Sequence, residues 1–431
     1  MSDSDRMMHL AVYALGTGNH SAGWRMDGAT DRHSSLEALR QIAATAERGR
    51  FDLFFLADSI AMSFNDHPSH QSRFEPLTAL GALSMLTKDI GLGATVSTSF
   101  SEPYNVARAF STLDHISDGR VAWNVVTSSS DTAALNFSRD ALNEHDKRYE
   151  IASEFVDVVR GLWDTWSEGA IVADRDTGVY LDDSKVKELN HKGTYFSVKG
   201  PLNIERSPQG HPLIIQAGGS PAGMDLSARV ADIVFEVVQD PAAAKNFYDS
   251  LKGMALKHGR KESDIRILPG VMTIVGNTEA EAKQKLNKLQ SWVTPTNALS
   301  LVSARLGHDI QGLSLDSPVP EFPLTERSQG FSRTLLELAL REKMTLRDLY
   351  NLIAAARGHW VLCGTPDYIA DVFEEWFTER RADGFMILPP YFSGGFDDFV
   401  DLVVPELQRR GLFKRDYAEG TMREKLGFAK K

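Results

Sequence analysis

The sequence predicts an α/β protein built as a (β/α)8 barrel that carries insertions over the carboxyl ends of its strands. Three observations predict this fold class: eight short apolar runs lie along the 431 residues, helical patterns separate most of them, and several runs end in polar residues. Continuous apolar runs are typical of parallel strands that are buried on both faces. An open doubly wound sheet shows the same alternation of strands and helices, so the count leaves that architecture as the alternative.

The helices between the predicted strands have recognisable ends. After the first strand, Ser34 and Glu37 are spaced as a capping box, and Gly49 stands where the helix should stop. A second helix is expected to start near Pro103, and a third has its apolar face at 155–163. The eight strand candidates are 9–15, 51–59, 90–98, 121–128, 211–218, 232–238, 265–275 and 384–391.

Two stretches interrupt this rhythm. Residues 168–210 are rich in Gly and Asp and are predicted to form hairpins, and residues 291–357 are predicted to form a helical lid with a Pro-rich loop. Insertions in a barrel usually cover the carboxyl ends of the strands, where the active site lies. We therefore expect one barrel domain over 1–431 with these two insertions.

Composition and charge exclude several function classes. The net charge of −11 disfavours binding to nucleic acid or to anionic lipid. The only cysteine, Cys363, excludes an intramolecular disulfide and a multi-cysteine metal site, and its apolar surroundings predict a buried, inert thiol. No apolar run approaches the roughly 20 residues of a membrane span, and the sequence predicts a cytoplasmic protein.

Polar residues at the ends of the predicted strands are the first candidates for chemistry, because barrel enzymes place their reacting groups there. They are Asp58, Thr95 with Ser97 and Thr98, and Asn124 with Thr127. Strands also end in polar residues simply because their ends meet solvent. Each of these residues, taken alone, can therefore have a purely structural role.

The segment QAGGSPAG at 216–223 follows a predicted strand and precedes a helix that is expected to begin around Gly223. Gly218 and Gly219 allow close approach of the backbone, and helix amides with the Ser220 hydroxyl suit a phosphate. A plain strand-to-helix turn explains the same letters. His145 and Tyr149 are four apart and share a helix face if the helix starts that early, although a capped helix start with exposed side chains has the same spacing.

No metal site is expected from the histidines of NDHPSH. His67 and His70 flank Pro68, and the chain has no HExxH motif. A polar loop near the mouth of the active site explains Asp66, Glu75 and these histidines.

The chain as a whole resembles the bacterial-luciferase-like flavin monooxygenases, in the branch that holds nitrilotriacetate, dibenzothiophene-sulfone and long-chain alkane monooxygenases. The resemblance covers nearly the whole chain. Its most specific segments are FFLADS, FEPLTALGALSMLTKDIGLGATVSTSFSEPYNVAR, SDGRVAWNVVTS, NFSRDALNEHDKRYEIASEFVDVVRGLWDTW, SPQGHPLIIQAGGSPAG and GTPDYIADVFEEWFTERRADGF.

This resemblance implies a two-component enzyme in which a separate NAD(P)H:flavin reductase supplies reduced FMN, and the barrel reacts it with O2. It implies Asp58 and Thr95 beside the flavin ring or ribityl chain, with Asn124 as a further ring-facing candidate. The phosphate would be held by His145, Tyr149 and Ser220, with Gly219 in the same turn. His20 and His308 are candidate catalytic residues for proton transfer or substrate orientation, although an exposed loop histidine is an equal alternative. A homodimer or homotetramer is implied too.

Other functions stay open at this point. A deazaflavin-dependent oxidoreductase of the same superfamily would need neither O2 nor a reductase, and a flavin-binding protein without turnover would keep only the phosphate residues. An unrelated barrel aldolase or hydrolase would need a Schiff-base lysine or metal carboxylates at strand ends, and neither is found there. The substrate is not identified, but Trp24, Phe64 and Phe74 near the predicted mouth lean toward an apolar or aromatic one unless they pack in the core.

Overall fold

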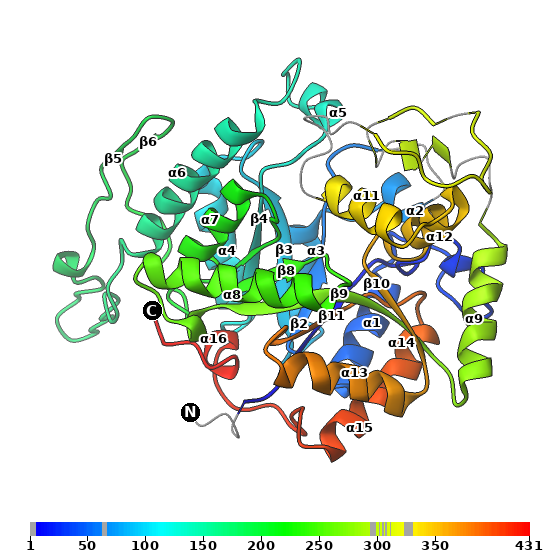
Figure 1. The fold of residues 1–431 in the computed structure, drawn as a ribbon. Helices are drawn as coiled ribbons and strands as arrows, with labels where there is room; N and C mark the ends of the chain where they lie inside the picture. The colour runs from blue at the N-terminus through cyan, green and yellow to red at the C-terminus, as the bar shows by residue number, and fades with distance from the viewer. Residues whose placement is uncertain are drawn as a thin grey trace.

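Eight parallel strands close into a barrel in the computed structural model (Figure 1). The structure describes residues 6–62, 67–293, 299–300, 302–303, 306, 308–310, 312–322 and 331–431. In spatial order the barrel strands are β1 (His9–Tyr13), β2 (Leu53–Leu56), β3 (Gly91–Ser97), β4 (Val121–Val126), β7 (Leu213–Gln216), β8 (Ile233–Glu236), β9 (Arg266–Val275) and β11 (Gly384–Ile387). Each of them lies within one of the eight predicted runs.

Strand β9 closes the barrel. Its residues 266–269 pair with β8, and its residues 270–271 pair with β11, which pairs in turn with β1. The sheet therefore has no open edge at this point, and the predicted (β/α)8 barrel is confirmed over the open doubly wound sheet.

A ninth strand was not predicted. β10 (Trp360–Gly364) pairs with residues 271–275 of β9, beyond the point where β9 leaves β8. Cys363 lies on this strand and is half-buried, so the prediction of a buried thiol is wrong. Burial still raises the pKa of the Cys363 thiol, which keeps it protonated and unreactive at neutral pH.

Helices surround the barrel and follow its strands. The prediction of a start near Pro103 is confirmed by α4, and 155–163 lies in α6. The predicted capping box is wrong, because Ser35 caps α1 through Ala38 N and Glu37 binds Arg40 instead. The helices are α1 (Leu36–Arg48), α2 (Pro68–Gln71), α3 (Pro76–Ser84), α4 (Pro103–Ile116), α5 (Asp131–Leu135), α6 (His145–Trp163), α7 (Pro221–Val230), α8 (Pro241–Lys257), α9 (Glu279–Ser291), α11 (Phe331–Arg341), α12 (Leu346–Ala356), α13 (Pro366–Thr378), α14 (Gly395–Asp398), α15 (Val404–Arg409) and α16 (Met422–Lys425), with the short turns η2 (Gly23–Arg25), η3 (Asp183–Lys185), η4 (Glu262–Asp264) and η6 (Phe399–Val403).

Apolar side chains fill the barrel interior. Alternate residues of each strand point inward, and they form one buried cluster with Leu53, Phe55, Ile215 and Phe235 at its centre. Gly93 makes room for them, since a Cβ there would lie 3.1 Å from Ile215 Cδ1. The barrel is therefore a packed core below its mouth, not a pore.

Three aspartates stabilise the amino-terminal end of the barrel. Asp52, Asp232 and Asp383 each stand immediately before a strand and are buried or nearly so. Each accepts a hydrogen bond from a backbone N–H of the neighbouring strand and forms an ion pair with a cation. Asp52 accepts from Leu10 N at 2.9 Å and pairs with Lys414 at 2.7 Å, and Asp232 accepts from Ile214 N at 2.8 Å and pairs with Arg423 at 3.2 Å. Asp383 accepts from Ile267 N at 3.0 Å and pairs with Lys252 at 2.9 Å. Burial alone would raise the pKa of Asp383, but Lys252 and Arg266 hold it below its usual value.

The two interruptions of the barrel rhythm differ in structure. Residues 166–206 carry the small hairpin of β5 (His191–Lys192) and β6 (Ser197–Val198), which Figure 1 shows extending beside α6. The later segment carries α11 and α12, which pack around an apolar cluster of their own. Figure 1 shows these two helices, with α2 and α5, at the upper end of the barrel, which is the end where the strands finish. Parts of this segment lie outside the described residues.

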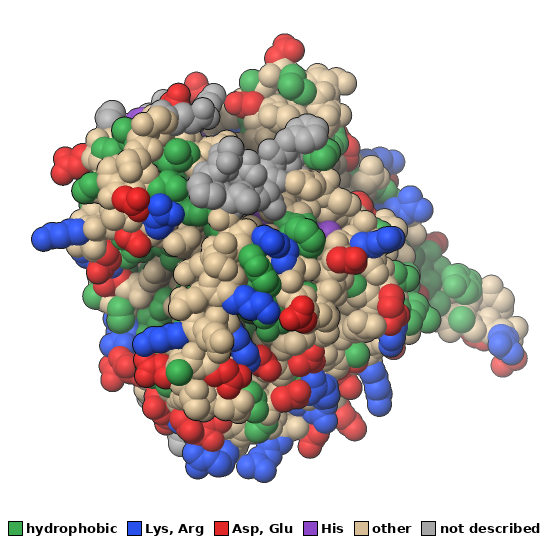
Figure 2. Space-filling model, turned by 90° about the vertical axis from the view of Figure 1, so that its right-hand side faces the viewer, with side chains coloured by type: hydrophobic (Ala, Val, Ile, Leu, Met, Phe, Trp, Pro, Cys, Tyr) green, Lys and Arg blue, Asp and Glu red, His purple; other side chains and the backbone are tan. Residues whose placement is uncertain are grey.

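No helix within the described ranges is long and apolar enough to cross a membrane. On the face that Figure 2 shows, acidic and basic side chains are interspersed over the lower part. Although the chain has a net charge of −11, this face therefore carries both signs of charge.

Candidate active site

The turn between β7 and α7 forms a cradle of backbone and hydroxyl groups. Ser220 caps α7, and its Oγ accepts a hydrogen bond from Gly223 N at 3.2 Å. A Cβ at Gly218 would lie 3.0 Å from Gly223 Cα and 3.2 Å from the Tyr149 hydroxyl. Only glycine permits this close approach. Nothing lies within 4 Å of a Cβ placed at Gly219, so the cradle is open on that side.

Helix α6 brings His145 and Tyr149 to this cradle. The helix starts at His145, so the two residues share a face as predicted, and their rings are 4.9 Å apart. A Cβ at Gly223 would lie 3.0 Å from the Tyr149 hydroxyl and 3.1 Å from Ser220 Oγ, so both hydroxyls lie beside Gly223. His145 is about one-third exposed and lies 2.8 Å from Asp146 Oδ1. Hydroxyls, an imidazole and the amino end of a helix suit an anion.

Arg148 is a cation beside this cradle that sequence reasoning did not consider. It lies in the same first turns of α6 and donates through Nη1 to the carbonyl of Ser128, at the end of β4. Its buried Nε has no hydrogen-bond partner among the residues that the structure describes. Arg148 is part of the HDKRY segment, but only the fold shows that it lies between α6 and the end of β4.

Thr95 and Asn124 lie side by side at the top of the barrel interior. They pair across β3 and β4, and Asn124 Nδ2 donates to Thr95 Oγ1 at 2.9 Å. Thr95 Oγ1 donates in turn to the carbonyl of Leu56 at 3.1 Å, which fixes the amide orientation. Asn124 Oδ1 is buried and accepts no hydrogen bond from any described residue. An unsatisfied buried acceptor costs about 1–3 kcal/mol, so this atom is suited to an N–H donor of a ligand.

Asp58 stands at the end of β2 and is partly buried. Its Oδ1 accepts Ser59 N at 2.7 Å. Burial raises the pKa of its carboxyl group, which Ser59 N and Arg73 partly oppose. The other strand-end residues have partners within the protein: Ser97 Oγ lies 2.7 Å from Ser128 Oγ, and Thr98 Oγ1 donates to the carbonyl of Val126.

His20 is buried in the loop after β1. The loop is held by Asn19 N and His20 N, which donate to the carbonyls of Pro389 and Pro390 at 2.9 and 3.1 Å. His20 Nδ1 accepts Ala22 N at 3.1 Å, so the ring proton is on Nε2. That Nε2 is buried without a partner in the described part of the chain, and burial lowers the pKa of His20 to about 3.

His308 lies in a different packing unit. Its ring stacks on Phe322 at 4.6 Å, and Phe322 packs against the apolar cluster of α11 and α12. His20 thus lies in a barrel loop, whereas His308 lies in the segment that carries α11 and α12.

The remaining residues predicted near the mouth differ in burial. His67 is buried, and its Nε2 lies 3.0 Å from the carbonyl of Asn19, so its ring is used in packing the first loop. Trp24 and Phe74 are 44% and 38% exposed, so they are not core residues. Phe64 and Asp66 lie outside the described residues, as does the side chain of His70.

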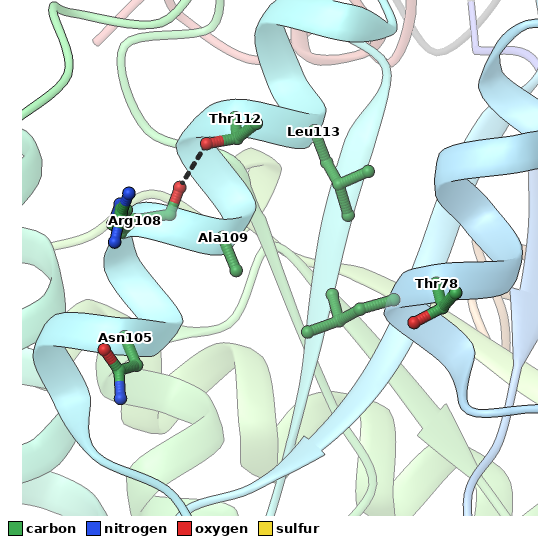
Figure 3. Close-up of a pocket in the computed structure, with 7 residues that line it drawn as sticks. Thr78, Asn105, Arg108, Ala109, Thr112 and Leu113 are labelled. Carbon is green, nitrogen blue, oxygen red and sulfur yellow. Dashed lines mark hydrogen bonds between the residues drawn. The ribbon is translucent and has the colours of Figure 1, made fainter.

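A groove on the outside of the barrel is separate from these residues. It lies between α3 and α4, where Figure 3 shows Ala109 and Leu113 of α4 on the side toward the helix that carries Thr78. Thr112 Oγ1 donates to the carbonyl of Arg108 at 2.8 Å, and none of the predicted site residues lines the groove. Its lining supplies no nucleophile or acid–base pair, so it is not the candidate site.

Comparison with known proteins places the chain in a family. Residues 17–383 match the family model described as luciferase-like monooxygenase. The chain is 44% identical to N-acetyl-S-(2-succino)cysteine monooxygenase of Bacillus subtilis (strain 168), with 100% of this chain and 98% of the relative covered. It is 43% identical to nitrilotriacetate monooxygenase component A of Aminobacter aminovorans, with 99% and 98% covered. A solved structure of riboflavin lyase with modified FMN and the substrate riboflavin superposes with a TM-score of 0.87 at 28% identity, and the match covers 99% of this chain and 97% of the other.

Proposed function

The chain belongs to the luciferase-like monooxygenase family, and from this premise we propose that it oxygenates a small organic substrate with O2 and reduced FMN. Reduced flavin, when bound, supplies the electron pair that activates O2. One oxygen atom is inserted into the substrate, which is thereby oxidised by two electrons. The other oxygen atom leaves as water. The observation that carries the proposal is that Asn124 lies on β4 and the cradle at Gly218 directly follows the neighbouring strand β7.

FMN is the flavin that this arrangement supports best. The cradle of Gly218, Ser220 and Tyr149 suits a phosphate, which FMN has and riboflavin lacks. The two relatives are named as monooxygenases, and the riboflavin lyase structure holds modified FMN, so FMN is favoured over the deazaflavin alternative.

A separate reductase is the inferred source of the reduced flavin. The nitrilotriacetate relative is named as component A of its enzyme. A second component that reduces flavin would make this chain half of a system, with reduced FMN as its co-substrate.

The phosphate residues act by hydrogen bonding and by position. The Ser220 and Tyr149 hydroxyls both lie beside Gly223, and the amino end of α7 adds a partial positive charge there. His145, partly exposed at the start of α6, lies against the Tyr149 ring and is the third group for the phosphate. Arg148 adds a positive charge behind them.

The ring residues orient the flavin at the top of the barrel. Asn124 Oδ1 is fixed by the bond of its own amide to Thr95, and it is available to accept an N–H from a flavin ring. Asp58 follows β2, two strands away from β4, and is a partly buried carboxyl group at the same end of the barrel.

His20 is proposed to orient the substrate and not to carry a proton. Because burial lowers its pKa to about 3, its ring stays neutral at working pH. A neutral ring with Nδ1 already bonded to Ala22 N can only donate through Nε2. His308, whose ring is stacked on Phe322, is retained as a candidate from the lid.

The substrate class follows from the relatives only in outline. Nitrilotriacetate and N-acetyl-S-(2-succino)cysteine both carry several carboxylates. An anionic organic substrate is therefore the first class to test for this chain.

The test is an anaerobic titration of the protein with reduced FMN and, in parallel, with reduced riboflavin, followed by mixing with 18O2 and each trial substrate. We expect tighter binding of FMN and one labelled oxygen atom in the product by mass spectrometry. Ser220→Asp is the sharpest variant, because Asp still caps α7 but repels a phosphate, so the preference for FMN should disappear while folding is kept. Binding without product from any substrate would favour a non-catalytic flavin protein, and absence of FMN binding would contradict the proposal.

A further inference from the structure

The hairpin turn of the first insertion, residues 193–196, closes around a carboxylate of α6. The backbone amides of 194–196 donate to the Glu154 carboxylate at distances between 2.9 and 3.2 Å. His191 Nε2, on β5, lies 3.0 Å from the same carboxylate. A Cβ at Gly193 would overlap Glu154 Oε1, so only glycine lets the turn close in this way. The turn is therefore shaped to this one side chain of the helix.

Tyr195 extends the contact toward the start of α6. Lys147 Nζ donates to the Tyr195 hydroxyl at 2.5 Å, and that hydroxyl donates to Glu150 Oε2 at 2.6 Å. Lys147 Nζ also lies over the Tyr195 ring, 4.4 Å from its centroid. The next residue of the turn, Phe196, packs edge-on against Phe155, with ring centroids 5.5 Å apart. The hairpin turn thus contacts α6 from its first turn to its middle.

The hairpin contacts the face of α6 that is turned away from the phosphate residues. Lys147, Glu150 and Glu154 are three and four positions apart and so share one face of the helix. His145 and Tyr149 share another face, which in a helix of about 3.6 residues per turn is rotated by roughly half a turn from the first. On that side the Tyr149 hydroxyl lies beside the cradle. The start of α6 is therefore held between the hairpin and the cradle.

The amino end of α6 depends on contacts of this kind. Glu144 occupies its N-cap position, and its side chain accepts no hydrogen bond from the described amides of the first turn. A helix start without a side-chain cap frays more readily, because its first N–H groups lack partners within the helix. The contacts of Lys147 and Glu150 with the hairpin restrain the part of α6 that has no such cap. The residues assigned to the flavin phosphate lie in this same part.

We propose that the hairpin turn fixes the amino end of α6 and thereby sets the affinity for the flavin phosphate, with Tyr195 as a positioning residue. The inference rests on the proposed function, in which His145 and Tyr149 hold that phosphate. Tyr195 acts through α6, because its hydroxyl restrains Lys147 and Glu150 beside them along the helix. A fixed helix end binds the phosphate without first paying the entropy of ordering its side chains. Binding of a flavin that has no phosphate is accordingly independent of the hairpin.

The test compares Tyr195→Phe with the wild type in anaerobic titrations with reduced FMN and with reduced riboflavin. The variant keeps the ring but loses the hydroxyl between Lys147 and Glu150. Reduced FMN should bind about 3-fold more weakly, the scale of an exposed charged contact, and reduced riboflavin should bind unchanged. Tyr180→Phe is the matched control, because Tyr180 lies in the same insertion and is 67% exposed, and it should change neither affinity. An equal loss for both flavins, or no loss for FMN, overturns the inference.

A second variant, Glu154→Gln, removes the charge around which the turn closes. It should weaken reduced FMN about 10-fold and leave riboflavin unchanged, since the amides of 194–196 lose a charged acceptor. Glu188→Gln is its control, because Glu188 pairs with Lys199 at 3.0 Å within the insertion, and its change should leave FMN affinity within about two-fold. A loss of the same size in both variants would contradict a specific role of the turn.

Hydrogen exchange of the flavin-free protein separates failure of this inference from failure of the proposed function. In Tyr195→Phe and Glu154→Gln the amides in the first turns of α6 should exchange about 3-fold faster or more, while those near the buried Trp163 keep their rates. Unchanged exchange in the first turns overturns the positioning role alone. A wild type that does not bind reduced FMN overturns the proposed function, and the role of the hairpin in phosphate binding with it.

Discussion

The two ends of the barrel treat buried polar groups in opposite ways. At the amino-terminal end, Asp52, Asp232 and Asp383 each have both an amide and a cation as partners. At the carboxyl end, Asn124 Oδ1 and His20 Nε2 are as deeply buried but have no partner among the described residues. The same kind of group thus stabilises the fold at one end and is left unsatisfied at the other.

This difference supports, without reference to any relative, the proposal that the site lies at the carboxyl end. A satisfied buried charge contributes to stability only, whereas an unsatisfied buried group lowers stability unless a ligand completes it. Substitutions at the two ends should accordingly change different measurable quantities, and four predictions test the contrast.

The largest effect is expected at the amino-terminal end. Asp383→Asn removes the charge that faces Lys252 and leaves a buried ammonium group, at a cost of about 3–5 kcal/mol in the free energy of unfolding. Denaturant unfolding should show it, while affinity for reduced FMN in the remaining folded protein stays unchanged. Asp416→Asn, at an aspartate that is 84% exposed, is the control and should cost well under about 1 kcal/mol. A comparable loss in both variants would mean that the pair at Asp383 has no special weight.

A change at the cradle should affect binding instead. Tyr149→Phe combined with Ser220→Ala should weaken reduced-FMN binding by about 1–3 kcal/mol, because two hydrogen bonds to a charged phosphate are lost. Titration of the flavin checks the binding, and thermal unfolding measures the separate loss of the α7 cap. Unchanged affinity in the folded double variant would remove the phosphate assignment.

The histidine at the carboxyl end predicts a dependence on pH. The pKa of His20 is about 3 in the folded protein against an ordinary value of 6.5, so the unfolded chain takes up the proton first. His20 therefore costs no stability above pH 6.5, and stability falls as the pH drops from 6.5 toward 3. At one pH unit below the ordinary value the loss is about 1.4 kcal/mol. His20→Asn keeps an acceptor for Ala22 N but does not titrate, so melting curves of this variant should fall less steeply on acidification; parallel curves would contradict the burial of a neutral ring.

The smallest effect on stability is expected at Asn124. Asn124→Leu removes the unsatisfied Oδ1 with little change of volume, so stability should change by less than about 1 kcal/mol in either direction. Affinity for reduced FMN and for reduced riboflavin should fall together, unlike in Ser220→Asp, because the amide is assigned to the ring and not to the phosphate. A loss confined to FMN would contradict that division.

The sequence could reveal the strands of the barrel because their signal is local. Each of the eight is a continuous apolar run, as strands buried on both faces require. β10 was not predicted because it is only half-buried, and its pairing with the second half of β9 is set by the fold and not by the local sequence. The cap of α1 was displaced by one residue because Ser34 and Ser35 are both suitable, and only the backbone decides which of them reaches an amide.

The candidate site residues also divide into those that have a local sequence signal and those that only the fold reveals. His145 with Tyr149, and Gly218 with Ser220, could be proposed from helix spacing and from a strand-to-helix turn. Tyr195 could not, because it contacts Lys147 across 48 positions of the chain. Arg148 likewise carries no local pattern, and its meaning comes from the groups that the fold brings beside it.

The shared strand β9 has a consequence for how such enzymes diversify. Its first half completes the barrel with β8 and β11, and its second half carries β10. The described residues between these strands, within 276–359, therefore leave and re-enter the same sheet and add no strand to the closed barrel. Because this segment begins and ends on one pair of neighbouring strands, its length and sequence can change without altering the pairing that closes the barrel.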